Sequence, residues 1–229
     1  SNFYHAKDFI EELDEKVAYL NPYIENFKNK QALLNWFKNE IKDLEEVYLI
    51  GHSLGGDLAR YLSSQFSQIT KLVLLDGGYL NLDKIMSLED ELADTEDYFR
   101  QQVFSNIEEV IASEKSQSSY WSKNLEEAVR NSYRYNSKTK LFELDLNLEK
   151  VLNLLSLRRS IKSFKSNLES KDVLFIAPVY QEEPEWRKEA LSQLPSNFNI
   201  IMLENSGHEL YTQKPREIAK IINDWINKK

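Results

Sequence analysis

Residues 47–58 read VYLIGHSLGGDL and contain the strongest indication of the fold in this sequence. The branched apolar run Val47–Ile50 predicts a buried β-strand, and Leu54 to Phe66 has the spacing of a helix. Between them lies Gly51-His52-Ser53-Leu54-Gly55, a G-x-S-x-G pattern at a strand-to-helix turn. A serine on such a sharp turn is held above the edge of a sheet, at the N-terminal end of the next helix. The pattern therefore indicates that Ser53 is a nucleophile.

The same glycines could instead belong to a loop that cradles a phosphate or a dinucleotide. The dinucleotide pattern G-x-G-x-x-G requires a second glycine where this chain has Ser53, and the Gly-Lys-Ser of a P-loop is missing from the sequence. We therefore favour serine chemistry over phosphate binding at this turn.

Further apolar runs predict the rest of a sheet. Continuous runs without alternation are typical of parallel strands that are covered on both faces. Besides Val47–Ile50, the predicted strands are Val17–Leu20, Leu72–Leu75, Val173–Ile176 and Asn199–Leu203. Helices are expected at Lys30 to Ile41, Leu54 to Phe66 and Pro215 to Ile226. This alternation predicts an α/β protein with a mostly parallel sheet flanked by helices.

The alternation stops between residues 82 and 170. Apolar residues in this segment recur at intervals of three and four, which is typical of helices. The sets run from Tyr98 to Ile111, from Trp121 to Tyr133 and from Val151 to Leu157. We therefore expect residues 82–170 to form an inserted helical subdomain, and residues 1–81 and 171–229 to form the α/β core.

Composition excludes several classes of function. The chain of 229 residues contains no cysteine, which rules out disulfides, thiol catalysis and cysteine-bound zinc. Its three histidines, His5, His52 and His208, have no ligand spacing along the sequence, so no histidine-based metal site is predicted. The formal net charge of −8 argues against nucleic-acid binding. No apolar run approaches the ~20 residues of a membrane span.

With these features the chain resembles the α/β-hydrolase fold family. The resemblance rests on GHSLGG at 51–56 as the nucleophile elbow, KLVLLDGG at 71–78 as the next strand, and Ser206-Gly207-His208-Glu209 as the loop of the catalytic histidine. The insertion at 82–170 matches the position of the family's cap domain. The resemblance implies a serine hydrolase that needs no cofactor and whose cap forms the substrate pocket.

A serine hydroxyl is a weak nucleophile and needs a base. In this family the triad runs serine, acid, histidine along the chain, and His208 is the one histidine that follows Ser53. The resemblance also implies that the backbone N–H of Leu54 is one donor of the oxyanion hole.

The resemblance leaves the acid of the triad open. The family's usual acid position, after the strand at 173–176, holds Gln181, and Glu182 and Glu183 follow at once. A second acid position known in the family, directly after the preceding strand, holds Asp76, which could also be a structural turn residue. Asp76, Glu182 and Glu183 are therefore alternatives for the group that orients His208 and stabilises its imidazolium.

The resemblance also implies a strand and a loop upstream of the first residue. The second oxyanion donor should come from that loop, and Ser1 to Leu13 resembles its tail and the following helix. The missing strand would lie between the predicted strands at 17–20 and 47–50. We therefore expect the printed sequence to lack at least one N-terminal strand with its loop, on the order of 10 residues. A rearranged sheet and a strand donated by a neighbour are the alternatives.

The expected function is hydrolysis of a small acyl ester, or of a related carbonyl compound, through an acyl-enzyme on Ser53. A non-catalytic hydrolase-like binding protein and an acyltransferase that uses the same serine are the alternatives. The absence of cysteine and of a visible export signal indicates a cytoplasmic protein. Aromatic residues of the insertion would either line the substrate pocket or pack in the insertion's own core: Phe99, Phe104, Trp121, Tyr133 and Tyr135.

Overall fold

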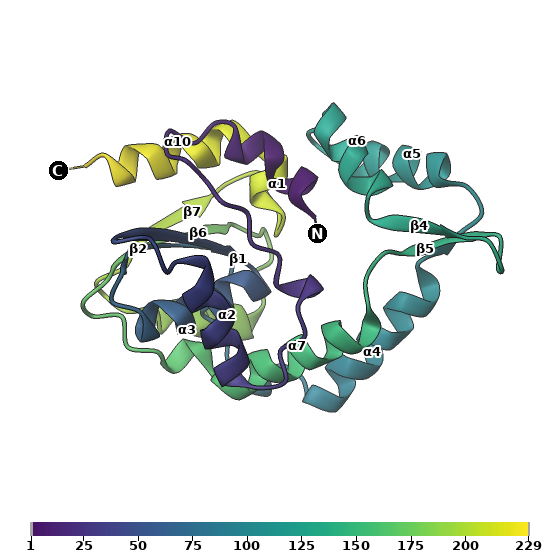
Figure 1. Ribbon diagram of the computed structural model, residues 1–229. Coiled ribbons are helices and arrows are strands. Elements are labelled where there is room, and N and C mark those ends of the chain that lie inside the picture. Colours follow the sequence, from purple (N-terminus) through teal and green to yellow (C-terminus); the bar gives the residue numbers. More distant parts are fainter. Residues whose placement is uncertain (1, 229) are drawn as a thin grey trace.

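The main sheet is parallel and has the strand order β1-β2-β6-β7 in the computed structural model, which describes residues 2–228 (Figure 1). Its strands are β1 (Val47–His52), β2 (Ile69–Leu75), β6 (Asp172–Pro178) and β7 (Asn199–Leu203). Four of the five predicted strands are therefore confirmed, and the last of them has the predicted bounds.

Helices cover both faces of this sheet, with α1 and α10 on one side and α2 and α3 on the other (Figure 1). The helices of the core are α1 (Phe3–Ile10), α2 (Lys30–Glu40), α3 (Leu54–Gln65), α8 (Glu185–Ser192), α9 (Leu210–Gln213) and α10 (Pro215–Ile226). The predictions for α2, α3 and α10 are confirmed, since each helix ends within one residue of the predicted position.

The apolar run of strand β2 is continuous because both faces of the strand are buried. Val73 and Leu75 belong to a core cluster with residues of α1 and α10, whereas Leu72 and Leu74 belong to another cluster that includes Ala59 of α3. Side chains of a strand alternate between the two faces of its sheet, so both faces of β2 meet helices. Each fully buried side chain of this kind contributes about 1.5–3 kcal/mol to folding.

The predicted strand at Val17–Leu20 is wrong. This segment has no regular structure and leads from α1 to a short 3₁₀ helix, η1 (Pro22–Ile24). Val17 is 36 % exposed, and only Leu20 packs against the core beside α2. Leu20 is therefore the residue by which this connecting segment packs onto the core. In the sheet formed by residues 2–228, β1 is an edge strand.

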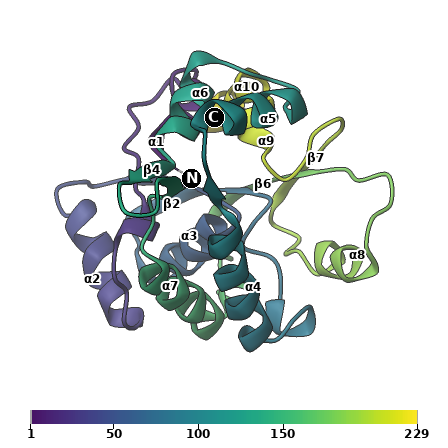
Figure 2. The same cartoon turned by 90° about the vertical axis from the view of Figure 1, so that its right-hand side faces the viewer.

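Residues 82–170, between β2 and β6, contain the expected helices and also a small antiparallel sheet that the sequence did not predict. The helices of this segment are α4 (Leu88–Gln101), α5 (Ile107–Gln117), α6 (Lys123–Arg130) and α7 (Leu148–Ile161), and 3₁₀ helices η2 (Leu82–Lys84) and η3 (Ser163–Lys165) stand at its two ends. The sheet has the order β3-β5-β4, from Val103–Phe104, Leu141–Leu144 and Tyr133–Asn136. Helix α6 lies beside α1, and α4 lies beside α7 on the side of α2 and α3 (Figure 1 and Figure 2).

The hairpin of β4 and β5 explains the departure from helix. Asn136 accepts a hydrogen bond from the backbone of Lys138, and Lys140 adopts a left-handed φ of 63°, which closes a tight turn. Tyr135 and Phe142 stand opposite each other in the ladder, with ring centroids 5.3 Å apart. Such aromatic cross-strand pairs stabilise antiparallel strands. Tyr133 therefore lies in β4 although its spacing from the apolar residues of α6 fits a helix.

Pocket lining and core packing were the two alternatives for five aromatic residues of this segment, and most of them pack in a core. Phe104, Trp121 and Tyr133 pack against the insertion's own core of Val110, Ile111 and Val129. Phe99 packs against the core cluster that joins α2, α3 and α7. Tyr135 remains exposed on the hairpin.

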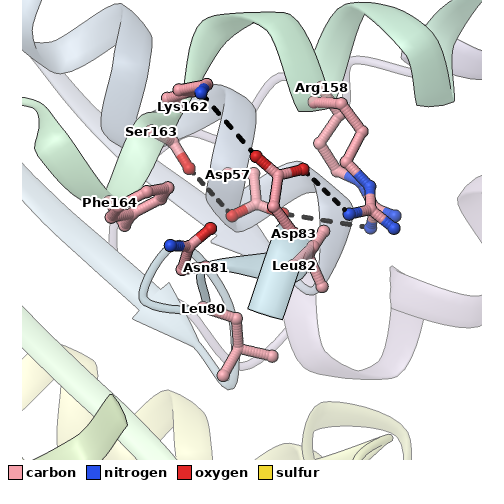
Figure 3. A pocket seen from close by; sticks show the side chains of 10 residues that line it. Asp57, Leu80, Asn81, Leu82, Asp83, Arg158, Lys162, Ser163 and Phe164 are labelled. Atoms are coloured by element: carbon pink, nitrogen blue, oxygen red, sulfur yellow. Dashed lines mark hydrogen bonds and ion pairs between the residues drawn. The ribbon is translucent and has the colours of Figure 1, made fainter. Parts of the chain in front are cut away.

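Buried ions join the insertion to α3. Figure 3 shows Asp57 of α3 accepting a hydrogen bond from Ser163, at 2.9 Å between the oxygens, with Arg158 of α7 beside it. Glu91 of α4 pairs with both Arg158 and Arg159, so one member of an otherwise exposed acidic helix start is buried. Burial raises the pKa of Asp57 to about 6, although the charge of Arg158 and the hydrogen bond from Ser163 act in the opposite direction. The helix that begins after Ser53 is thereby fixed to the insertion.

Candidate active site

Ser53 occupies a strained turn between β1 and α3. Its φ of 52° and ψ of −123° lie outside the regions that non-glycine residues commonly adopt. Glycines make room for the turn: a Cβ atom on Gly51 would lie 2.4 Å from the carbonyl oxygen of Gly55, and one on Gly77 would lie 2.3 Å from that of Ser53. The backbone N–H of Ser53 donates to the carbonyl of Leu75, at 3.1 Å, which ties the turn to β2.

His208 lies between Ser53 and Asp76, although it comes from the far end of the chain. Its Nε2 lies 2.9 Å from the Oγ of Ser53, and its Nδ1 lies 2.8 Å from Oδ2 of Asp76. A carboxylate only accepts, so Nδ1 carries the proton and Nε2 accepts from the serine hydroxyl. The three residues follow the carboxyl ends of β1, β2 and β7, which lie at one edge of a parallel sheet.

Asp76 is held rigidly at the end of β2. It is 6 % exposed, it adopts a left-handed φ of 41°, and its backbone N–H donates to the carbonyl of Ile176 at 2.8 Å. Burial by itself would raise the pKa of Asp76, but the hydrogen bond from His208 and the charge of Arg187 outweigh burial and lower that pKa. The carboxylate therefore stays ionised and raises the pKa of His208 through their hydrogen bond, against the opposing effect of burial.

Arg187 of α8 lies directly behind this carboxylate. Arg187 is only 2 % exposed, and its guanidinium donates from Nη2 to Oδ1 of Asp76, at 3.2 Å, and from Nε to the hydroxyl of Tyr79, at 2.9 Å. Tyr79 donates in turn to Oδ1 of Asp76, at 3.1 Å, and Arg187 also pairs with Glu183. A chain of charged groups therefore runs from His208 through Asp76 and Arg187 to Glu183.

The structure separates the three acids proposed from the sequence. Asp76 contacts His208, Glu183 contacts Arg187 instead, and Glu182 is exposed, as is Gln181. Glu183 therefore pairs with Arg187, which in turn donates to Asp76, the acid that contacts His208. Sequence reasoning missed Arg187 and Tyr79; the spacing of four residues between Glu183 and Arg187 was the available signal for a buried pair.

Leu54 is the first residue of α3 and is buried beside the turn. The first backbone N–H groups of a helix have no acceptor within the helix, and the helix dipole adds partial positive charge there. The N–H of Leu54 is therefore suited to an oxyanion that forms next to Ser53.

The other two histidines have different surroundings. Nε2 of His52 donates to the backbone carbonyl of His208, at 2.8 Å, and the ring packs against Tyr211. His5 accepts from the backbone N–H of Asn2, at 3.1 Å, and completes the cap of α1; burial lowers the pKa of His5 to about 4. The fold also brings His52, His208 and Glu209 close enough to share a cation, which the spacing of histidines along the sequence did not predict.

Together these contacts describe a serine whose proton has an acceptor and whose acceptor is oriented by an ionised acid. Such an arrangement turns a weakly nucleophilic hydroxyl into an attacking group, provided that a carbonyl carbon is within reach of Oγ.

Among residues 2–228, no helix combines the length and the apolar character that a membrane crossing requires.

Comparison with known proteins gives a family and a set of structural relatives. The family model described as alpha/beta hydrolase fold matches residues 24–167. No curated protein matches the chain. Because structural relatives below 25 % identity indicate the fold alone, the solved structures described next are similar to this chain in architecture.

One of these structures is E-2-(acetamidomethylene)succinate hydrolase, with a TM-score of 0.68 and 15% identity over 89% of this chain and 75% of that one. A carboxylesterase of the ammonia-oxidising thaumarchaeon Nitrososphaera gargenis has a TM-score of 0.61 and 15% identity, over 91% and 77% of the two chains. The thioesterase domain from the curacin biosynthetic pathway has a TM-score of 0.60 and 15% identity, over 90% and 76%.

Proposed function

Since this chain belongs to the alpha/beta hydrolase fold family, we propose that it is a serine hydrolase that cleaves a small acyl ester, or a related carbonyl compound, through an acyl-enzyme on Ser53. The observation that carries the proposal is the unbroken line of hydrogen bonds from Ser53 through His208 to Asp76. A packing role alone would not require an ionised, buried carboxylate behind a histidine that accepts from a strained serine.

In the proposed reaction, Ser53 Oγ attacks the carbonyl carbon while Nε2 of His208 takes the hydroxyl proton. The carbonyl oxygen becomes an oxyanion, to which the N–H of Leu54 donates. When the tetrahedral intermediate collapses, His208 returns the proton to the leaving alcohol or thiol. Water then attacks the acyl-enzyme with His208 as its base, and the carboxylic acid leaves as Ser53 is regenerated. Asp76 stays ionised throughout, where it orients the imidazole and stabilises its charged form.

Residues 82–170 form a cap in this proposal, beside a core made of residues 1–81 and 171–229. Support comes from the contacts of α7 with the start of α3: Leu54 and Leu58 share a core cluster with Val151 and Leu154. A cap so close to the nucleophile would restrict which acyl groups reach Ser53.

The structural relatives suggest the substrate class. A carboxylesterase and a thioesterase domain share this fold, so esters and thioesters of small acids are the first compounds to test. An acyltransferase would use the same serine and differ only in the nucleophile that resolves the acyl-enzyme, so product analysis with an added alcohol separates the two.

The proposal is tested with p-nitrophenyl esters of graded acyl length. We expect hydrolysis by the unaltered chain and a loss of at least about 10⁴-fold in kcat/KM for Ser53→Ala. Ser64→Ala is the matched control, because Ser64 lies in the same α3 and donates only to the carbonyl of Tyr61. Equal activity of Ser53→Ala and the unaltered chain would refute the proposal.

A further inference from the structure

Two histidines and a glutamate meet beside the candidate nucleophile. One nitrogen of His52, one nitrogen of His208 and one carboxylate oxygen of Glu209 lie within 4.8 Å of one another. Two imidazoles and a carboxylate form the ligand set of zinc sites that keep one position open. Neighbouring ligand atoms of a tetrahedral zinc ion lie about 3.4 Å apart. Side-chain rotations that move the ligand atoms by about an ångström would therefore let all three bind one ion. Glu209 is exposed, and His208 is 45 % exposed, so solvent leaves room for that movement.

The hydrogen bonds around the two rings leave one nitrogen lone pair on each. Because a backbone carbonyl only accepts, Nε2 of His52 carries the proton that it donates to the carbonyl of His208, and Nδ1 keeps its lone pair. In His208 the proton is on Nδ1, facing Asp76, and the lone pair is on Nε2. Asp76 therefore stands where a carboxylate usually stands behind a metal-ligating histidine, orienting the ring and strengthening it as a ligand.

We propose that His52, His208 and Glu209 form an inhibitory site for a transition-metal dication such as Zn²⁺. The lone pair of His208 that the ion takes is the one that accepts the hydroxyl of Ser53, at 2.9 Å. The ion and the serine proton cannot occupy it together, so the bound ion removes the base from the nucleophile. Metal binding follows from the geometry of the three side chains, whereas the resulting loss of activity rests also on the proposed function.

The ligand types predict which ions bind. Imidazole nitrogen suits Zn²⁺, Cu²⁺ and Ni²⁺, whereas Mg²⁺ prefers an all-oxygen shell. We therefore expect zinc to bind and inhibit at concentrations at which magnesium has no effect.

Binding is measured on the Ser53→Ala variant, in competition with a chromophoric zinc indicator at neutral pH. We expect one Zn²⁺ per chain. His52→Asn, which keeps a donor toward the carbonyl of His208, and Glu209→Gln should each weaken binding at least tenfold, the lower bound for losing even an outer-shell partner. Glu204→Gln is the matched control, since Glu204 is an exposed glutamate of the same loop outside the cluster, and it should bind zinc unchanged. No zinc bound, or zinc bound equally by all variants, would overturn the inference.

A second arm keeps this inference separate from the proposed function. In the chain that retains Ser53, zinc should slow labelling by a fluorophosphonate probe and a chelator should restore it, and Glu209→Gln should raise the zinc concentration for half inhibition by the factor found in the binding arm. Zinc that binds at the cluster but leaves labelling unchanged would refute its inhibitory role. A chain that is not labelled even without metal would contradict the proposed function, and the binding arm would still decide whether the site exists.

Discussion

Arg187 donates from Nη2 to Oδ1 of Asp76, while Oδ2 of the same carboxylate accepts from His208. The buried carboxylate therefore lies between a guanidinium and an imidazole. Asp76 raises the pKa of His208, and the charge of Arg187 lowers it. Glu183 pairs with Arg187 and offsets part of that positive charge. The basicity of His208 thus depends on groups that do not touch it.

Glu183→Gln should move the acid limb of the pH profile for kcat/KM to lower pH. The substitution removes a negative charge and leaves Arg187 less compensated, so the imidazolium of His208 becomes less favourable and the pKa of His208 falls. His208 acts as a base only when it is neutral, so the acid limb of the profile moves with the pKa of His208. Because the charge of Glu183 acts through Arg187 and Asp76, we expect the limb to move by on the order of half a pH unit. Glu182→Gln is the matched control, since Glu182 is exposed, and its profile should not move. A shift of the limb to higher pH in Glu183→Gln would contradict the account of this chain of charges.

Asp76→Asn should lower kcat by about 10⁴-fold, the loss that the same exchange causes in a serine protease whose imidazole then adopts the wrong tautomer. The measurement is ester hydrolysis by variants whose fold is checked by circular dichroism. If Glu182 were the acid, Glu182→Gln would show the large loss and Asp76→Asn would be nearly fully active.

Gly77→Ala should reduce activity by about 10²-fold, because it displaces the turn that carries Ser53. A methyl group at Gly77 would lie 2.3 Å from the carbonyl oxygen of Ser53. Misplacement of a catalytic group by about an ångström lowers the rate by about 10²-fold. Gly55→Ala is the control, because a Cβ atom at Gly55 meets nothing within 4 Å. Steady-state kinetics of both variants test this, and equal activity would show that the elbow tolerates displacement.

Asp57 should make the protein less stable as the pH rises from about 4 to about 6. Its pKa is raised from 3.8 to about 6 in the folded protein, so over this interval the folded chain binds more protons than the unfolded one, and stability falls with pH. A shift of this size corresponds to about 3 kcal/mol. Asp57→Asn should remove this part of the pH dependence of the melting temperature, and Asp83→Asn, at an exposed position in the same ion cluster, should keep it. Identical pH dependence in Asp57→Asn and the unaltered chain would contradict the assignment.

The sequence predicted those parts of the fold and site that local patterns specify. The four strands with apolar residues on both faces follow from their continuous apolar runs, and the turn at Ser53 follows from the G-x-S-x-G pattern between a strand and a helix. Val17–Leu20 shows the limit of that reasoning, because a short apolar run does not reveal whether a pairing strand is available. The hairpin at Tyr133–Leu144 shows another, because tertiary packing and turn geometry overrode helical spacing.

The acid and its support could not be fixed from the sequence for a related reason. Asp76, Glu182 and Glu183 all follow strand ends, and only the tertiary contacts show that Asp76 meets His208 while Glu183 pairs with Arg187 of α8. The same packing buries Arg187 against Asp76, a contact between residues that are 111 positions apart.

Activation of Ser53 by His208 and Asp76 can be measured with a fluorophosphonate probe, whose adduct is located by mass spectrometry. This measurement needs no knowledge of the substrate. We expect one adduct per chain on Ser53, fast labelling of the unaltered chain and of Ser64→Ala, and no adduct on Ser53→Ala. A folded chain that takes up no probe, or that takes it up equally when Ser53 is replaced, would show that His208 and Asp76 do not activate Ser53.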